Sequence, residues 1–342
     1  MTASDSGQVR ARVEFAMFPD LPPRLFPPPV VERLRRVAEI DLGDPLTEFR
    51  SLGAQARLRE ADVLLTGWGS PRLDSAALVH AAGLKAVVHA AGTVKGHLGP
   101  EVFARGVPVS SAADANAVPV AEYTLAMILL AGKGVPGLAR EYRAARADLR
   151  LPRRDLTIGN YRRTVGLLGA SKIGRRVLAL LRPFDFRVLL CDPYVDAATA
   201  GDLGATLVGL PELFATADVV SLHAPATEET RGLVSAGLLA SMADGATLIN
   251  TARGSLVDED ALIKELRTGR ISAVLDVTEP EIPAAGSPLW ELPNVVLTPH
   301  VAGALGNELH RLGESAADEV LRVLTGRSLR HPVDPAVLAI TA

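Results

Sequence analysis

Short apolar runs alternate with segments of helical periodicity along most of the chain. In the N-terminal part the alternation runs through residues 13–18, 30–37, 63–66, 76–82, 84–89 and 107–110. A second series begins at Thr164, with strands expected at residues 164–168, 187–191, 218–222, 246–250, 271–275 and 294–298. Repeated alternation of strand and helix predicts parallel sheets covered by helices.

Two features outside these series divide the chain. A strongly apolar helix follows Asn116, and the arginine-rich segment 140–163 shows little pattern. The last amphipathic stretch, residues 307–324, lies beyond the second series and is expected to return to the first domain. We therefore predict an α/β fold with two Rossmann-like or flavodoxin-like domains, each a doubly wound parallel sheet. The first comprises residues 1–114 plus 307–342, and the second comprises residues 115–306.

Three segments were considered for irregular structure, membrane insertion and secretion. The proline-rich stretch 19–29 is expected to be an irregular surface connection. The most apolar window, residues 117–132, contains Glu122 and is too short to cross a bilayer, so we expect a buried helix and no membrane contact. The N-terminus has no cationic segment followed by an apolar core, which predicts no signal peptide.

Composition excludes several classes of protein. With 342 residues, 48% of them hydrophobic and 22% charged, the chain is long enough for two ordinary globular domains. Its net charge of −3 shows no basic excess, so nucleic acid is not an expected partner. Cys191 is the only cysteine, which excludes an internal disulfide and favours a cytoplasmic protein. No cluster of His, Asp and Glu has metal-ligand spacing, and we predict no metal.

A glycine-containing turn at the start of the second domain favours a dinucleotide site. An apolar run ends at Gly169, a helical pattern follows, and the next apolar run stops at Asp192. Gly169 would make the tight turn, Gly174 would let helix and strand approach closely, and the helix N-terminus would bind a pyrophosphate. Asp192 would accept the ribose hydroxyls and repel the extra phosphate of NADP, which indicates NAD. Ser171 replaces the usual second glycine, although its hydroxyl can donate to a phosphate oxygen; a plain strand-to-helix turn would leave Asp192 unexplained.

Three polar side chains stand just beyond the carboxyl ends of three predicted strands. Arg253 follows the strand at 246–250, Glu281 the strand at 271–275 and His300 the strand at 294–298. Ligands of doubly wound sheets bind outside these ends. Each residue alone also has a structural interpretation, as an ion-pair partner, a loop acid or a strand-end histidine. Their common placement favours a site.

This trio suits hydride transfer between a 2-hydroxy acid and its 2-oxo acid. Histidine is the side chain whose ordinary pKa lies nearest neutrality, so His300 is the candidate acid and base. Glu281 would orient the imidazole through the ring nitrogen that faces away from the substrate. Arg253 would hold the 2-oxo oxygen and the carboxylate together with its planar guanidinium. We expect the active-site cleft between the two domains.

At this point the sequence resembles the D-isomer-specific 2-hydroxyacid dehydrogenases, the family of phosphoglycerate, glycerate, D-lactate and formate dehydrogenases. The resemblance extends from about Val63 to Gly326. Its specific parts are residues 165–174, 218–225 with 230–232, 250–258, 275–277 with Glu281, and 288–303. It implies that the second domain binds NAD and that the first binds the substrate.

The resemblance also implies roles for individual residues. Arg253, Glu281 and His300 would be the catalytic triad. The cofactor would contact Gly169, Ser171, Lys172, Ile173, Gly174, Asp192, His223, Ala224, Pro225, Thr230, Thr251, Ala252, Asp276 and Gly303, with Asp276 at the nicotinamide carboxamide. The substrate would contact Arg253 and the main chain of Gly92, Thr93, Val94 and Lys95. A homodimer built on the NAD-binding domain is a further family expectation.

Departures from the family pattern leave alternatives open. Glu279 precedes Pro280 as in the usual Glu-Pro pair, so Glu279 is a rival of Glu281 for the catalytic carboxylate. Val94 stands where a second glycine is commoner, so the identity of the substrate stays open.

The alternative function is a catalytically weak, NAD(H)-sensing corepressor of the same fold. A Rossmann dehydrogenase for amino or sugar substrates is disfavoured because no recognisable lysine base lies in the loops of residues 250–303.

Overall fold

The computed structural model describes residues 10–153 and 157–338, which form two compact units. Unit 1 contains residues 10–116 and 304–338, and unit 2 contains the described residues between 117 and 303. The chain thus leaves unit 1 after Asn116 and returns to it at Ala304, close to the expected boundaries after residues 114 and 306.

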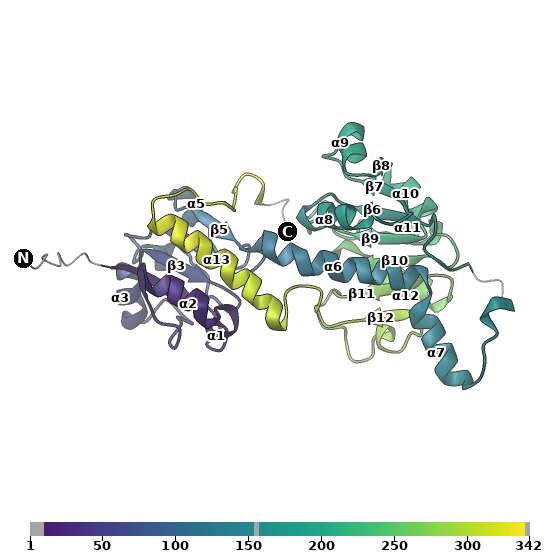
Figure 1. Ribbon diagram of the computed structural model, residues 1–342, viewed down its shortest axis with the longest axis horizontal. Helices are drawn as coiled ribbons and strands as arrows, with labels where there is room; N and C mark the ends of the chain where they lie inside the picture. The colour runs from purple at the N-terminus through teal and green to yellow at the C-terminus, as the bar shows by residue number, and fades with distance from the viewer. Residues whose placement is uncertain (1–9, 154–156, 339–342) are drawn as a thin grey trace, which may run out of the picture. The chain divides into compact units, whose positions relative to one another are not determined.

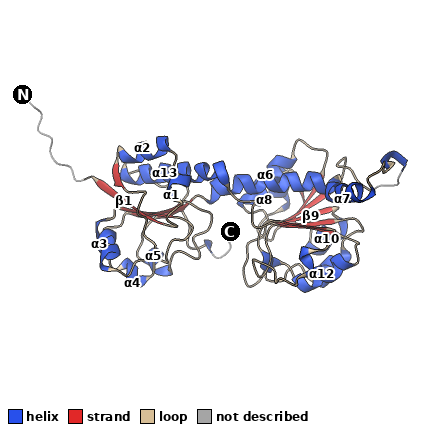
Figure 2. Ribbon diagram, turned by 90° about the horizontal axis from the view of Figure 1, so that it is seen from below, coloured by secondary structure: helices blue, strands red, loops and turns tan. Residues whose placement is uncertain are grey.

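Unit 1 is a five-stranded parallel sheet with the strand order β2-β1-β3-β4-β5, the order of flavodoxin-like folds. Its strands are β1 (Ala11–Ala16), β2 (Ala38–Ile40), β3 (Val63–Thr66), β4 (Ala86–His89) and β5 (Val109–Ser111). Its helices are α1 (Pro22–Leu25), α2 (Pro28–Arg35), α3 (Leu52–Glu60), α4 (Ser75–Leu78), α5 (Pro100–Ala104) and α13 (Leu309–Leu324), which the short helix η4 (Gly306–Glu308) precedes. Helices cover both faces of the sheet (Figure 2).

The C-terminal helix α13 lies beside α1 and α2, which come from the opposite end of the sequence (Figure 1). Leu312 and Ala316 of α13 join Leu25 and Leu34 in one core on this face of the sheet. A second core on the other face includes Leu58 of α3. Val63 and Leu65 of the central strand β3 enter the first core and Leu64 enters the second, so these three residues form a continuous apolar run, as expected of a parallel strand covered on both sides.

Two local expectations for unit 1 are wrong. The proline-rich stretch 19–29 is not an irregular connection, because α1 starts at Pro22 and α2 at Pro28. Proline suits the first turn of a helix, where its missing N–H has no partner to lose. Leu25, within that stretch, is fully buried and belongs to the core. The edge strand β2 was not expected, since its three residues are too few to give a periodic signal.

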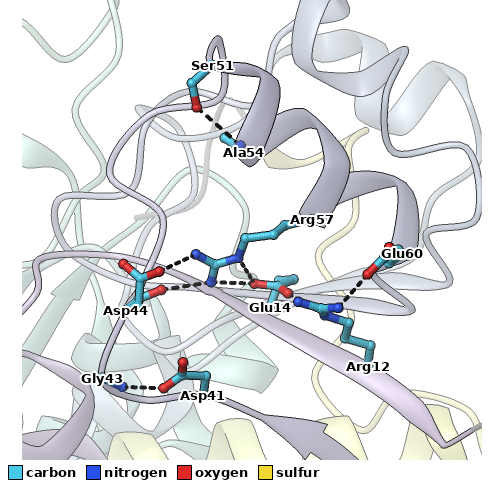
Figure 3. Close-up of polar contacts among 9 residues, drawn as sticks. All are labelled: Arg12, Glu14, Asp41, Gly43, Asp44, Ser51, Ala54, Arg57 and Glu60. Atoms are coloured by element: carbon cyan, nitrogen blue, oxygen red, sulfur yellow. Dashed lines mark hydrogen bonds and ion pairs between the residues drawn. The ribbon is translucent and has the colours of Figure 1, made fainter.

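A buried carboxylate joins β1 to α3 (Figure 3). Glu14 is only 3% exposed, and it accepts hydrogen bonds from Nε of Arg12 at 2.6 Å and from Nε and Nη2 of Arg57 at 2.9 and 2.6 Å. Arg57 also donates to the side chain of Asp44, and Arg12 to that of Glu60. Burying a carboxylate is costly unless it is paired and hydrogen-bonded, and two guanidinium groups meet both conditions here.

Unit 2 is a seven-stranded parallel sheet with the order β12-β11-β10-β9-β6-β7-β8, which extends the Rossmann order by one strand. Its strands are β6 (Thr164–Leu168), β7 (Arg187–Cys191), β8 (Thr206–Leu207), β9 (Val219–Leu222), β10 (Thr247–Asn250), β11 (Ser272–Leu275) and β12 (Val295–Leu297). Its helices are α7 (Val135–Ala145), α8 (Lys172–Leu181), α9 (Ala197–Asp202), α10 (Leu210–Thr216), α11 (Ala236–Ser241) and α12 (Glu259–Arg267), with short helices η1 (Leu151–Arg153), η2 (Gly254–Leu256) and η3 (Pro288–Trp290). Most of α6 (Ala113–Gly132) also belongs here.

The predicted α/β class is confirmed, and each expected strand of unit 2 is found within a residue or two of its expected ends. The sequence predicted six strands for unit 2, and the sheet has seven. The missing strand, β8, consists of Thr206 and Leu207 at the edge of the sheet, and two residues cannot show an alternating pattern.

Helix α6 is longer than the apolar window suggested. Its 20 residues from Ala113 to Gly132 are long and apolar enough to cross a membrane by length and composition, so the expectation that it is too short is wrong. In the structure, however, Ala121 and Ile128 pack into the core of unit 2 with strand residues such as Leu167. The core therefore accounts for part of its apolar character, since 39% of its most apolar window is buried.

His89 is a buried titratable group at the carboxyl end of β4. It is 1% exposed, its Nδ1 lies 2.8 Å from the hydroxyl of Thr66, and its ring lies 4.9 Å from that of His97 between centroids. Burial lowers the pKa of His89 to about 3, and the neighbouring His97 adds to this effect. The unfolded chain therefore binds a proton below about pH 6.5 that the folded unit does not bind.

We predict that this histidine makes unit 1 less stable in acid. Since its pKa is lower in the folded state, the stabilisation is complete above about pH 6.5 and declines as the pH falls, with about 2 kcal/mol lost at pH 5. Urea unfolding at pH 7.5 and 5 should show a loss for the wild type that His89→Gln lacks. In a Trp290→Phe background, Trp68 is the remaining tryptophan and reports on unit 1. Equal pH dependence in both proteins would contradict the prediction.

Candidate functional site

The glycine turn of unit 2 lies where the strand order reverses, between β6 and β9. Gly169 has φ of +102°, and a Cβ on it would lie 2.7 Å from the amide nitrogen of Ala224. A Cβ on Gly174 would lie 2.1 Å from the carbonyl oxygen of Gly169. Both positions therefore require glycine, the first for its backbone conformation and the second for close packing of helix on strand.

Ser171 is the N-cap of α8, and its hydroxyl accepts a hydrogen bond from the amide of Gly174 at 3.3 Å. Lys172 and Ile173 form the first turn of that helix. The serine thus satisfies one of the orphan N–H groups at the helix start, which glycine in the usual fingerprint cannot do.

Asp192 follows β7 directly and faces the same turn. One of its carboxylate oxygens accepts the amide of Ala170 at 2.6 Å, and the other accepts the amide of Tyr194 at 2.8 Å. A carboxylate has about four lone-pair positions, so acceptor capacity remains on both oxygens. The side chain is only partly buried and is held at the glycine turn by the two bonds.

The segment after β9 supplies four further predicted residues. His223 is 3% exposed, its Nε2 lies 2.9 Å from the hydroxyl of Ser221, and burial lowers its pKa to about 3. The amide of His223 donates to the carbonyl of Leu168, which joins this segment to the glycine turn. Ala224 and Pro225 follow, and the hydroxyl of Thr230 donates to the carbonyl of Pro225 at 2.7 Å. The histidine is therefore a neutral group beside the turn.

Arg253 lies in a tightly held loop after β10. Asn250 braces this loop, because its side chain donates to the carbonyl of Arg253 at 2.8 Å and accepts from the amide of Ala252 at 3.0 Å. Within the described part of the chain, the only hydrogen bond of the guanidinium goes to the carbonyl of Ala252, at 2.6 Å. Burial lowers the pKa of Arg253, and the charge of Glu281 opposes that shift. Its other N–H donors are available to an anionic ligand.

His300 and Glu281 are in direct contact. Nδ1 of the histidine lies 2.6 Å from Oε1 of the glutamate, and both side chains are about half exposed. The rival carboxylate Glu279 has no such contact with the imidazole in the described structure; its amide lies 3.4 Å from a carboxylate oxygen of Glu259. This geometry favours Glu281 over Glu279 as the partner of the histidine.

Asp276 and Gly303 bound the segment that carries His300. Asp276 is 2% exposed, and its carboxylate accepts the hydroxyl of Thr298 at 2.7 Å and the amides of Val301 and Ala302 at 2.8 and 2.9 Å. Gly303 is the last residue of unit 2 before the chain returns to unit 1. The carboxylate of Asp276 therefore stabilises the loop that carries His300, in addition to the ligand contact predicted for it.

The residues predicted to bind the substrate carboxylate follow β4 in unit 1. Gly92 and Thr93 are half-buried, and Lys95 is exposed. Val94 is 2% exposed because its side chain enters the core of unit 1, so only its main chain is available to a ligand. The hydrophobic side chain that departed from the family pattern is therefore used for packing.

Three residues that make hydrogen bonds within the candidate site, Tyr123, Thr124 and Thr298, were not predicted to be functional. Tyr123 and Thr124 of α6 contact the hydroxyls of Thr298 and Thr251 at 2.9 and 3.0 Å. These contacts join positions more than a hundred residues apart, and the apolar pattern of α6 gives no sign of them.

Comparison with known proteins identifies the family of this chain. The family described as D-isomer specific 2-hydroxyacid dehydrogenase, NAD binding domain, matches residues 125–302. The D-3-phosphoglycerate dehydrogenase of Mycobacterium leprae (strain TN) is 37% identical over 284 residues, which are 82% of this chain and 52% of that protein. A solved structure from Thermus thermophilus is 33% identical, with 94% of this chain and 100% of that chain covered and a TM-score of 0.74.

A phosphoglycerate oxidoreductase from Rhizobium etli has a TM-score of 0.81 at 20% identity, over 96% of this chain and 100% of that one, which shows the shared fold. The chain spans about half the length of the curated relatives it matches. The family match covers more than half of the chain and contains the glycine turn, Asp192, Arg253, Glu281 and His300. The resemblance noted in the sequence is confirmed, and with it NAD as the cofactor. The chain belongs to the D-isomer specific 2-hydroxyacid dehydrogenase family, and unit 2 carries its NAD-binding domain.

Proposed function

We propose that this protein is an NAD-dependent dehydrogenase that interconverts a small D-2-hydroxy acid and its 2-oxo acid. The contact between His300 and Glu281, 2.6 Å long, carries the proposal. It pairs an imidazole with a carboxylate in the unit that also holds Arg253, whose guanidinium retains unused donors. These are the groups that proton transfer and carboxylate binding require.

His300 is proposed to exchange a proton with the substrate oxygen. When Nδ1–H donates to Glu281, the neutral ring has its lone pair on Nε2, and this nitrogen accepts the hydroxyl proton during oxidation. In the reverse direction Nε2–H gives the proton to the carbonyl oxygen. Glu281 keeps the tautomer and the orientation of the ring constant and stabilises the imidazolium that forms.

Arg253 is proposed to bind the substrate through its carboxylate and its 2-oxo oxygen. The guanidinium is planar and its donors form a fork, so it can address two oxygens together, as lysine cannot. Burial makes the cation costly to hold, and an anionic substrate would offset that cost. The same donors would stabilise negative charge that develops on the oxygen. The main chain of residues 92–95 in unit 1 is proposed to bind the carboxylate as well.

The glycine cradle fits the cofactor, because a Cβ at Gly169 or Gly174 would fill the approach to the turn. We propose that the first turn of α8 holds the pyrophosphate, that Asp192 holds the ribose, and that residues 251–253 and Asp276 lie at the nicotinamide end. His223, Ala224, Pro225, Thr230 and Gly303 complete the proposed set. Bound NAD supplies the carbon that accepts or returns the hydride.

We also propose that the protein is a cytoplasmic homodimer formed through unit 2. Helix α7 supports this, because none of its 11 residues is buried although its sequence is amphipathic. Val135 and Tyr142 on this helix are 39% and 61% exposed, and Tyr161 is 71% exposed. Exposed aromatic and aliphatic groups of this kind are typical of surfaces that a second subunit covers.

We predict that His300→Ala lowers kcat by roughly 100-fold or more, through loss of proton transfer. The measurement is NADH oxidation with a panel of 2-oxo acids including glyoxylate, hydroxypyruvate, pyruvate and phenylpyruvate, and His310→Ala in unit 1 serves as the control. Near-normal turnover in His300→Ala would refute the assignment. If the wild type binds NADH by fluorescence yet turns over none of the acids, the corepressor alternative is favoured.

Asp192→Asn is expected to reduce the preference for NAD over NADP. The substitution keeps an acceptor oxygen at the turn but removes the charge that repels a 2′-phosphate, and a change of about 10-fold in the ratio of kcat/KM values corresponds to about 1.4 kcal/mol. Steady-state kinetics with both cofactors measures it, with Asp202→Ala on α9 as the control. An unchanged ratio would show that Asp192 does not contact the ribose.

For the homodimer, light scattering of the purified chain should give about twice the mass of one 36.0 kDa chain. Tyr142→Glu should shift the distribution toward monomer, because it places a charge in a surface that dimerisation would desolvate. Tyr194→Glu, at a 77% exposed position in the loop between β7 and α9, should not. A monomer in the wild type would exclude this assembly.

A further inference from the structure

Three side chains form a continuous line of hydrogen bonds inside unit 2. The hydroxyl of Tyr123 lies 2.9 Å from that of Thr298, and the hydroxyl of Thr298 donates to Oδ1 of Asp276 at 2.7 Å. Tyr123 belongs to α6, Thr298 follows β12, and Asp276 follows β11. The line therefore reaches from a helix on one face of the sheet to the carboxyl ends of two adjacent strands.

The direction of each bond follows from the number of protons. Thr298 has a single hydroxyl proton and gives it to the carboxylate, so its oxygen accepts the proton of Tyr123. A phenol is protonated near neutral pH because its ordinary pKa is about 10, and burial raises the pKa of Tyr123 further. Tyr123 is thus the donor that begins the line.

Asp276 in turn fixes the backbone around His300. Its carboxylate accepts the amides of Val301 and Ala302, and its carbonyl oxygen accepts the amide of His300 at 3.0 Å. His300 has φ of +52°, the left-handed region that a residue with a Cβ occupies at a cost. Such a conformation persists only where the surrounding contacts impose it.

We propose that Tyr123 is a positioning residue for His300, acting through Thr298 and Asp276. Without the phenol proton, the oxygen of Thr298 loses its donor and the threonine rotamer is no longer held by the helix. The Asp276 carboxylate can then turn, and the amides that keep His300 in its left-handed conformation lose their fixed acceptor. Because proton transfer depends on the placement of the imidazole, the loss appears in the chemical step.

This inference rests on the proposed function for its catalytic readout, but its structural readout is independent of activity. The variants are Tyr123→Phe, which removes only the phenol oxygen, and Thr298→Val, which removes only the hydroxyl donor. Thr298→Ser keeps the hydroxyl and tests for rescue. Thr268→Val is the matched control for loss of a hydroxyl, since this threonine of unit 2 is exposed at the end of α12.

Two measurements are made on each variant. In the first, kcat and both KM values are determined with the best 2-oxo acid, and Tyr123→Phe and Thr298→Val should lower kcat roughly 10-fold while both KM values stay within about 2-fold. In the second, hydrogen exchange of the amides of Val301 and Ala302 should become roughly 10-fold faster in the same two variants. Thr298→Ser and Thr268→Val should resemble the wild type in both.

The outcomes separate this proposal from the proposed function. Unchanged amide exchange in Tyr123→Phe, or an unchanged kcat in an active enzyme, would overturn the positioning role. A rise in KM with constant kcat would also overturn it, because it would assign the line to ligand binding. A wild type without turnover, in which the amides still respond to Tyr123→Phe, would refute the dehydrogenase proposal and support the placement of His300 by Tyr123.

Discussion

The need to satisfy one buried carboxylate organises the loops at the carboxyl ends of β11 and β12 in unit 2. Asp276 lies at the end of β11, almost wholly withdrawn from water, so its oxygens must find donors within the protein. The donors are the hydroxyl of Thr298 and the amides of Val301 and Ala302, so the chain after β12 is held against the end of β11. The left-handed backbone of His300 is a consequence, and the imidazole reaches Glu281 from that position.

A steric constraint has the same effect at the cofactor turn. The backbone at Gly169 and Gly174 passes so close to its neighbours that neither position has room for a side chain. Asp192 lies within hydrogen-bonding distance of this turn, and its carboxylate accepts the amide of Ala170. The polar groups of the proposed site therefore owe their positions to packing and hydrogen bonding that exist before any ligand binds, which is the condition for low reorganisation on binding.

Where expectation and structure differ, the reason is local. The prolines of residues 19–29 predict an irregular connection, but two of them stand at the first position of a helix, where proline is well suited. The edge strands β2 and β8 are too short for periodicity to detect. The apolar window did not include the start of α6 because residues 113–116, which lie in unit 1, are polar or small. None of these errors affects the strands that carry the site.

The sequence by itself predicted the α/β class, six of the seven strands of unit 2 and the glycine turn, because each has a signature within a few neighbouring residues. The three residues proposed for catalysis come from the same kind of local signal, their place just beyond a strand end. The tertiary structure alone decided which carboxylate meets His300, that Val94 is used for packing, and that Tyr123 reaches Thr298. Those pairings join residues brought together only when the strands are ordered and the helices packed. The periodicity of apolar residues cannot predict these contacts, because they join residues that are close in the fold and far apart in the sequence.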